Sequence, residues 1–218
     1  MELKIVSRSD VSRPDFSKYD KELLATGNFS DVRLECGSKT YNLHKSIICN
    51  RCVWFRRALT GSYKEAKTNV VCLTTFSPEQ VDIMVCYLYT GTLNIPSEIP
   101  TNDLLKLLVD FVVVADYFLL DAECHSAVLE RMRWSLNGGG TKRRWPDFVE
   151  AVEHAYGLEL VDNETPRLME ARKVLIDWYN EKHETARKKM GPGAFAFLTQ
   201  VPPFALDVLL ARDRDENK

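Results

Sequence analysis

The side chains of this sequence that could do chemistry gather around one histidine and two cysteines. His44 lies a few residues before Cys49 and Cys52, an arrangement in which an imidazole could activate a thiol as a nucleophile. Such a pair needs a third group that orients the base, and nothing near His44 or Cys52 suggests one. The sequence also lacks a phosphate-binding glycine loop, a Gly-x-Ser-x-Gly elbow and a His-Glu-x-x-His helix. We therefore expect no catalytic residues and no enzymatic activity.

The spacing Cys49-x-x-Cys52 is also that of a zinc-binding pair. Structural zinc takes four ligands, usually from two short-spaced pairs separated by a loop. The other candidates, Cys36, Cys72 and Cys86, fall in separate predicted elements. We interpret the cysteines as small buried apolar residues, and we expect neither a metal nor a cofactor.

Composition and charge narrow the class of protein. Of the 218 residues, 45% are hydrophobic and 28% are charged, as in ordinary globular proteins. The net charge of −2 argues against direct nucleic-acid binding, which needs a basic face. Lys106, Asp110 and Asp116 interrupt the most apolar run, residues 104–120, which excludes a membrane span. Because the N-terminus lacks the features of a signal peptide, we expect an intracellular protein of the cytoplasm, the nucleus or both.

The pattern after residue 30 predicts a β-hairpin followed by a long helix. Apolar and charged residues alternate in Val32–Cys36, and Gly37 suits the first central position of a type II′ turn before a return strand at residues 39–43. Apolar residues with helical spacing predict a single helix over residues 44–60. Gly61 follows as an expected left-handed stop residue, and residues 69–73 form a short apolar run that predicts a buried strand.

Helices dominate the rest of the chain. Ser77-Pro78-Glu79-Gln80 is a capping box with proline at the first helical position, and Gly91 is expected to end that helix. Further helices are predicted over 102–117, 121–135, 145–156, 167–189 and 204–210. The aromatic residues Trp145, Phe148 and Tyr156 could line a ligand groove, but their helical spacing favours core packing. The class is α+β.

Four segments in this order resemble the BTB (also called POZ) domain family. They are Phe29-Ser30-Asp31-Val32, His44-Lys45, Tyr87-Leu88-Tyr89-Thr90-Gly91 and Ala115-Asp116-Tyr117. The resemblance covers residues 25–136, and it implies a small mixed β-sheet with helical hairpins. BTB domains are interaction modules with no chemistry of their own.

The remaining segments are interpreted around this domain. Residues 1–24 are read as an N-terminal arm with a dimer-packing strand and helix. The C-terminal part resembles the helical extension of short fungal members of the family. We expect a flexible linker at 137–144, with the basic triplet Lys142–Arg144, then a helical extension at 145–211 and a disordered charged tail at 212–218.

The resemblance implies a homodimer. In BTB dimers an acidic residue and a basic residue at the positions of Asp31 and Lys45 line a pocket near the subunit interface. The alternative is a hairpin ion pair of little energetic value. Leu23 and Leu24 of the arm are expected to pack against the partner subunit in a two-fold arrangement.

Tyr63-Lys64-Glu65 resembles the hydrophobic-x-Glu motif with which BTB adaptors engage the third member of the cullin series, a ubiquitin-ligase scaffold. The alternative is that Tyr63 covers a helix end and Glu65 is solvated. The leading hypothesis is a dimeric adaptor that links a cullin to an unknown substrate. The second is a transcription-associated scaffold that recruits regulatory proteins through the dimer groove.

Overall fold

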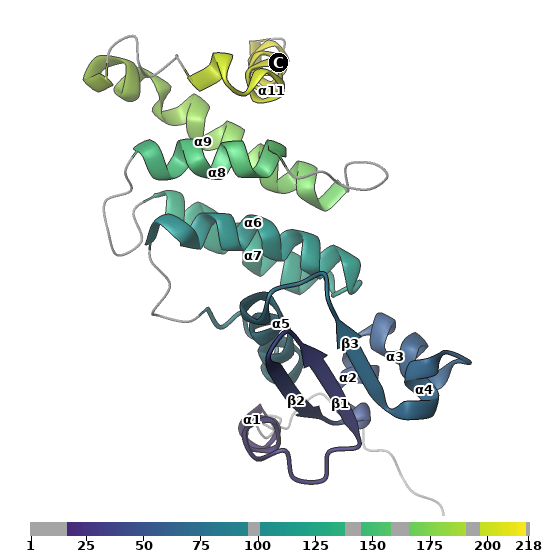
Figure 1. The fold of residues 1–218 in the computed structure, drawn as a ribbon. Coiled ribbons are helices and arrows are strands. Elements are labelled where there is room, and N and C mark those ends of the chain that lie inside the picture. The colour runs from purple at the N-terminus through teal and green to yellow at the C-terminus, as the bar shows by residue number, and fades with distance from the viewer. Residues whose placement is uncertain (1–16, 96–100, 138–144, 158–165, 191–196, 217–218) are drawn as a thin grey trace, which may run out of the picture.

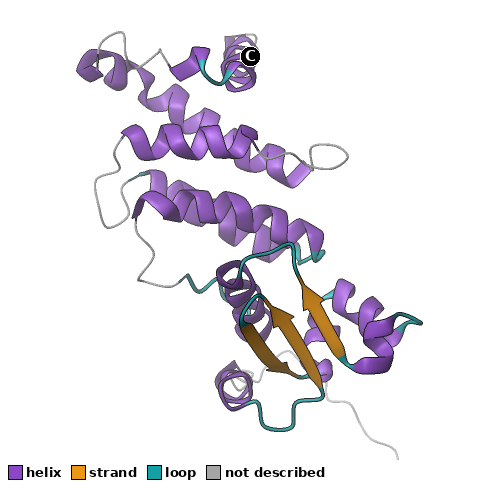
Figure 2. Cartoon of the chain, viewed as in Figure 1, coloured by secondary structure: helices purple, strands orange, loops and turns teal. Residues whose placement is uncertain are grey.

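The computed structural model describes residues 17–95, 101–137, 145–157, 166–190 and 197–216. Residues 1–16 of the expected N-terminal arm and the basic triplet Lys142–Arg144 lie outside these residues. The first half of the chain combines a small sheet with helices, and the second half is helical (Figure 1, Figure 2). The expected α+β class is confirmed.

The first half of the chain contains three strands and five helices among the described residues. In chain order they are α1 (Ser17–Thr26), β1 (Val32–Cys36), β2 (Lys39–Leu43), α2 (Lys45–Arg51), α3 (Val53–Thr60), α4 (Lys64–Thr68), β3 (Val70–Leu73) and α5 (Pro78–Thr90). The second half continues with α6 (Thr101–Tyr117), α7 (Ala122–Leu136), α8 (Trp145–Gly157), α9 (Pro166–Met190), the short 3-10 helix η1 (Phe197–Thr199) and α11 (Pro202–Glu216).

The described sheet has three strands in the order β2-β1-β3. β1 and β2 are antiparallel and Cys36 pairs with Lys39, which leaves a two-residue turn. Gly37 has a φ of 56°, as the predicted type II′ turn requires. β3 runs parallel to β1. The strand prediction for β3 is confirmed, but only one of its faces is buried, because Cys72 is exposed while Val71 and Leu73 are not.

The single helix predicted over 44–60 is wrong. Cys52 is extended, with φ −137° and ψ 119°, and it divides the segment into α2 and α3. The side chain of Arg56 stabilises this break between the two helices. Its Nε donates to the carbonyl of Cys49 at 2.7 Å and its Nη2 to that of Asn50 at 3.4 Å, so carbonyls freed at the end of α2 find partners.

Gly61 does not adopt the expected left-handed conformation. Its φ is −84°, and glycine is needed there for space. A Cβ at this position would lie 2.8 Å from the carbonyl oxygen of Arg57. The left-handed residue of this region is Asn69, which ends α4 with a φ of 55°.

The boundaries of α5 are as predicted. The Ser77 hydroxyl accepts the backbone N–H of Gln80 at 3.3 Å, and the Gln80 side chain accepts that of Ser77 at 2.8 Å. Gly91 ends the helix in the left-handed region, with a φ of 67°.

Helices α6 and α7 lie between the sheet-containing half and the helices α8 and α9 (Figure 1). One continuous set of buried apolar side chains runs from Val32 to Val208. Arg167 of α9 donates to the carbonyls of Ala115 and Leu120 at 3.3 and 2.9 Å. Helix α9 is therefore packed on α6 and the α6–α7 loop, and the C-terminal helices share one core with the rest of the fold.

The aromatic residues of the second half fill this core. Phe148 is fully buried and stacks on Tyr179 at a ring-centroid distance of 6.3 Å. Trp145 and Tyr156 are partly buried against the same cluster. Core packing, the favoured reading of Trp145, Phe148 and Tyr156, agrees with these positions, although Tyr156 also lines a surface groove between α9 and α11.

Two further expectations are corrected. Helix α11 continues to Glu216, so residues 212–216 of the expected disordered tail are helical. The guanidinium Nε of Arg212 donates to the Asn180 side chain at 3.0 Å, which ties this end of α11 to α9. The cysteines are also not uniformly buried, since Cys72 is exposed and Cys86 is half-buried.

Among the described helices, none combines the length and apolarity needed to cross a bilayer.

Candidate functional site

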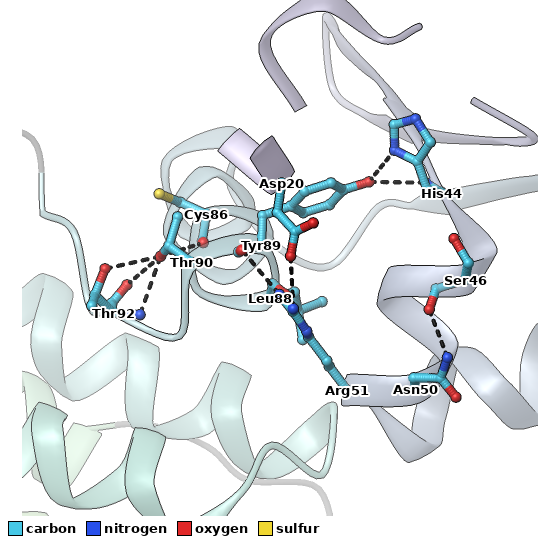
Figure 3. Close-up of polar contacts among 10 residues, drawn as sticks. All are labelled: Asp20, His44, Ser46, Asn50, Arg51, Cys86, Leu88, Tyr89, Thr90 and Thr92. Carbon is cyan, nitrogen blue, oxygen red and sulfur yellow. Dashed lines mark hydrogen bonds and ion pairs between the residues drawn. The ribbon is translucent and has the colours of Figure 1, made fainter. Parts of the chain in front are cut away.

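His44 and Cys52, the residues considered for catalysis, are both used to hold elements together. The Nε2 of His44 lies 2.7 Å from the carbonyl of Asn28. Its Nδ1 lies 2.7 Å from the Tyr89 hydroxyl (Figure 3). The carbonyl can only accept, so Nε2 carries a proton. The Cys52 thiol donates to the carbonyl of Phe118 at 3.1 Å. Burial raises the pKa of this thiol, which disfavours the nucleophilic thiolate.

Tyr89 and Arg51 connect the two ends of α2 to the end of α5. The Tyr89 hydroxyl also accepts the backbone N–H of His44 at 2.9 Å, and burial raises the pKa of Tyr89 to about 12. Arg51 donates from Nη1 to the carbonyls of Leu88 and Tyr89 at 2.7 and 2.9 Å, and from Nη2 to Asp20 of α1 at 2.7 Å (Figure 3). A cation at the end of a helix complements its dipole. These contacts fix α1 against the rest of the fold.

Asp31 and Lys45 do not form the ion pair considered above. The Asp31 carboxylate accepts the backbone N–H of Lys45 at 2.8 Å. His44, the residue before α2, makes no side-chain cap of its own, so Asp31 supplies the cap from the strand side. The Lys45 ammonium donates instead to the Asn69 side chain at 2.5 Å. Both residues organise the junction of sheet and helix, and their place in a dimer pocket stays a prediction.

The α1 region combines packed and exposed apolar residues. Leu23 and Leu24 are half-buried and pack against the core. Phe29, in the loop that follows α1, is 90% exposed and has a φ of 63°. A bulky residue in the left-handed region is strained. No sequence signal indicates that this phenylalanine faces solvent, because the Phe29–Val32 segment serves only as a marker of the fold.

Tyr63 and Glu65 are brought together in a surface cavity of about 360 Å³. Tyr63 precedes α4 and is 62% exposed, while Glu65 in the first turn of α4 is half-buried. The cavity is also lined by Trp54, Arg57 and Ala58 of α3 and by Leu119. We call these six residues the Tyr63 groove.

Leu119 and Trp54 of the Tyr63 groove were not anticipated. Leu119 is 48% exposed, with a φ of 54°, between α6 and α7. Trp54 packs edge-on against Phe118 at 5.0 Å between ring centroids. Sequence spacing gives no signal for either role, because Leu119 lies far along the chain from Tyr63 and reaches it only through the packing of α6 on α3.

The thiols offer no evident reactive or metal-binding centre in the described residues, where no cluster of three potential ligands occurs. Burial raises the pKa of Cys124 to about 12. The exposed Cys72 donates to the Glu35 carboxylate at 3.4 Å, and this hydrogen bond raises its pKa.

The family is identified from the N-terminal part of the chain. Residues 21–122 match the family model described as the BTB/POZ domain. The chain therefore carries a BTB/POZ domain. The expected family and fold are confirmed, although the match begins before residue 25 and ends before residue 136. BTB/POZ domains mediate protein–protein interaction, and the family is one of non-enzymatic modules.

Similar proteins of known sequence share this BTB region. A BTB/POZ domain-containing protein of Arabidopsis thaliana is 29% identical over 114 residues, which are 50% of this chain and 14% of that protein. The mouse Rho-related BTB domain-containing protein 2 is 33% identical over 89 residues, 41% and 12% of the two chains. The human Kelch repeat and BTB domain-containing protein 4 is 29% identical over 70 residues, 32% and 13%. The chain thus spans a small fraction of the length of these relatives.

Two solved structures are similar to part of this chain. The BTB domain of zebrafish PATZ1 is 16% identical, with a TM-score of 0.44 over 61% of this chain and 98% of that one. The BTB domain of human gigaxonin is 18% identical, with a TM-score of 0.42 over 58% and 99%.

Proposed function

We propose that this protein is a homodimeric BTB adaptor that presents the Tyr63 groove to a cullin scaffold. The observation that carries the proposal is the groove itself. The residues that resemble the hydrophobic-x-Glu motif, Tyr63 and Glu65, line one surface cavity.

The groove has the composition of a protein-binding site. Its walls include Trp54, Tyr63 and Leu119, of which the last two are strongly exposed. Aromatic residues in such positions serve as anchors in protein interfaces. Glu65 and Arg57 give the groove one charge of each sign. An amphipathic helix of the partner would place an apolar side chain against Tyr63 and Leu119 and a polar group against Glu65.

A second copy of the chain is proposed to cover the α1 region. Phe29 is almost fully exposed in a strained conformation, and such strain is retained where the surroundings require it. Burial of Phe29 together with the half-exposed Leu23 and Leu24 would remove apolar surface from water in a two-fold dimer.

The two surfaces lie at different edges of the sheet, so both can be occupied at once. The end of α1 meets β2, where a Cβ on Gly27 would lie 3.0 Å from Asn42, whereas α4 contacts β3. β2 and β3 are the two outer strands of the described sheet (Figure 1). One dimer can therefore carry two cullin-binding grooves.

The test is retention of the purified chain by an immobilised cullin N-terminal domain. Tyr63→Ala should lose most of the retention, because the aromatic anchor of the groove is removed. Trp134→Ala is the control, since Trp134 on α7 is also an exposed aromatic residue, 46% against 62% for Tyr63, and lies outside both proposed surfaces. Equal retention of the parent and Tyr63→Ala would remove the motif from the proposal.

A further inference from the structure

A second groove lies in the C-terminal helices, beyond the residues that match the BTB/POZ model. It has a volume of about 370 Å³ and runs between α9 and α11, with Tyr156 of α8 at its floor. In Figure 1 these helices form the part of the molecule farthest from the sheet. We call it the α9–α11 groove.

Both walls of the α9–α11 groove present apolar side chains. On α11, Leu206 and Leu210 are one helical turn apart and are 57% and 44% exposed. On α9, Met169 is 55% exposed, whereas Ile176, about 10 Å further along the same helix, is buried beneath the groove. Exposed apolar residues are common singly, but a contiguous set along a groove marks an interaction site.

The floor of the groove is fixed by polar contacts. The Tyr156 hydroxyl donates to Asp207 of α11 at 2.7 Å. The Arg172 guanidinium of α9 lies 4.4 Å from the centre of the Tyr156 ring and donates to the carbonyl of Ala155 at 3.0 and 3.2 Å. These contacts hold α8, α9 and α11 at a set separation. The groove is therefore preformed, which lowers the conformational cost of filling it.

Most charges along the groove are already paired within the chain. On α9, Glu170 lies 2.9 Å from His125, and Lys173 lies 3.7 Å from Asp177. Arg214, in the last part of α11, is exposed and has no hydrogen bond or ion pair with any residue that the structure describes. Arg214 is therefore a lining cation that a carboxylate of a ligand could meet.

We infer that the α9–α11 groove binds an amphipathic helix of another protein, with two apolar side chains one turn apart and a carboxylate that meets Arg214. Leu206 and Leu210, one turn apart on α11, match the pair of apolar side chains that one face of a partner helix presents at i and i+4. The inference goes beyond the proposed function, because it concerns other helices and does not depend on Tyr63.

The probe is a fluorescent alanine-rich peptide of about 15 residues, the shortest length at which such a helix is stable alone. It carries leucines at i and i+4 and a glutamate one turn beyond them. A second peptide has lysine in place of the glutamate. Binding to the full chain is followed by fluorescence anisotropy at low ionic strength, where charge pairs are least screened.

Two substitutions on one helix separate groove binding from general stickiness. Leu206→Gln removes a wall residue and should weaken binding of the glutamate peptide by about tenfold or more. Leu209→Gln is the matched control, because Leu209 is 58% exposed on the same helix but does not line the groove. It should leave binding unchanged. Arg214→Glu should reverse the preference, so that the lysine peptide binds more tightly than the glutamate peptide.

Other outcomes would overturn the inference. These are the absence of saturable binding, equal effects of Leu206→Gln and Leu209→Gln, and an unchanged peptide preference in Arg214→Glu. Sedimentation of the chain alone tests a second copy as the occupant. If Leu206→Gln lowers the mass of the assembly and Leu209→Gln does not, a copy of this chain fills the groove and no partner helix is needed. Retention on a cullin is expected to be the same for all three variants.

Discussion

The Asp31 carboxylate accepts the backbone N–H of Lys45 at a distance of 2.8 Å. Asp31 stands immediately before β1, and Lys45 is the first residue of α2. The carboxylate thus occupies the position of a helix N-cap although it comes from another element. The contact joins two segments that mark the family, and it explains the spacing between them as a matter of folding.

Asp31→Ala should lower the free energy of unfolding by about 1 kcal/mol, the usual cost of a lost N-cap. Urea unfolding followed by circular dichroism measures the change. Asp31→Asn retains an acceptor oxygen, so its loss should be smaller. Equal stability of Asp31→Ala and the parent would show that the cap does not stabilise the fold.

Tyr89→Phe should also destabilise the fold, by about 1–3 kcal/mol, because the buried N–H and Nδ1 of His44 would lose their partner. The matched control is Tyr63→Phe, whose hydroxyl belongs to a side chain that is 62% exposed. That substitution should leave the unfolding midpoint in urea unchanged. Equal midpoints for the two variants would contradict the role given to the His44–Tyr89 contact.

The contact of His154 with Asp110 predicts a dependence on pH. Their 2.7 Å hydrogen bond joins α8 to α6 and is the main cause that raises the pKa of His154 above 6.5. Because the pKa is raised in the folded state, the stabilisation is complete below the unfolded value of 6.5 and is lost as the pH rises through the folded pKa. Lys106 opposes this rise in pKa and Glu150 adds to it.

The measurement is the difference in unfolding free energy between the parent and His154→Gln at about pH 6 and about pH 8, on either side of the region where histidine titrates. The parent should have its larger advantage at the lower pH. A difference that does not change with pH would mean that the pair does not carry its charge in the fold.

Phe29 connects a strained backbone conformation with the proposed dimer interface. Asn adopts the left-handed region more readily than a bulky residue does, so Phe29→Asn should stabilise the isolated chain by up to about 1 kcal/mol. The same substitution removes apolar surface from the proposed dimer face and should raise the dimer dissociation constant. Sedimentation equilibrium over a range of concentrations measures the second effect. Unchanged self-association would exclude Phe29 from the interface.

Local sequence patterns were sufficient to predict those parts of the structure that depend on contacts between neighbours in the sequence. Ser77 and Gln80 cap each other within one turn, and Gly37 closes a hairpin whose two strands adjoin it. Both were predicted because the same residues that carry the signal also make the contacts.

Long-range contacts account for what the sequence did not predict. The helical spacing of Ile48, Cys52 and Phe55 is the same whether or not the helix breaks, and the break is supported by Arg56 and by the carbonyl of Phe118. The end of α11 looks like a charged tail until Arg212 meets Asn180, 32 residues away along the chain. Leu119 likewise joins Tyr63 and Glu65 only in the folded chain.

The central claim, a dimer with cullin-binding grooves, is tested most directly by the mass of the particle in solution. Light scattering at micromolar concentration should give twice the 25.0 kDa of one chain, and a heavier complex should form when a cullin N-terminal domain is added. Tyr63→Ala should keep the dimer mass and lose the complex. A mass of 25.0 kDa for the chain, with no heavier species in the presence of the cullin domain, would contradict the account.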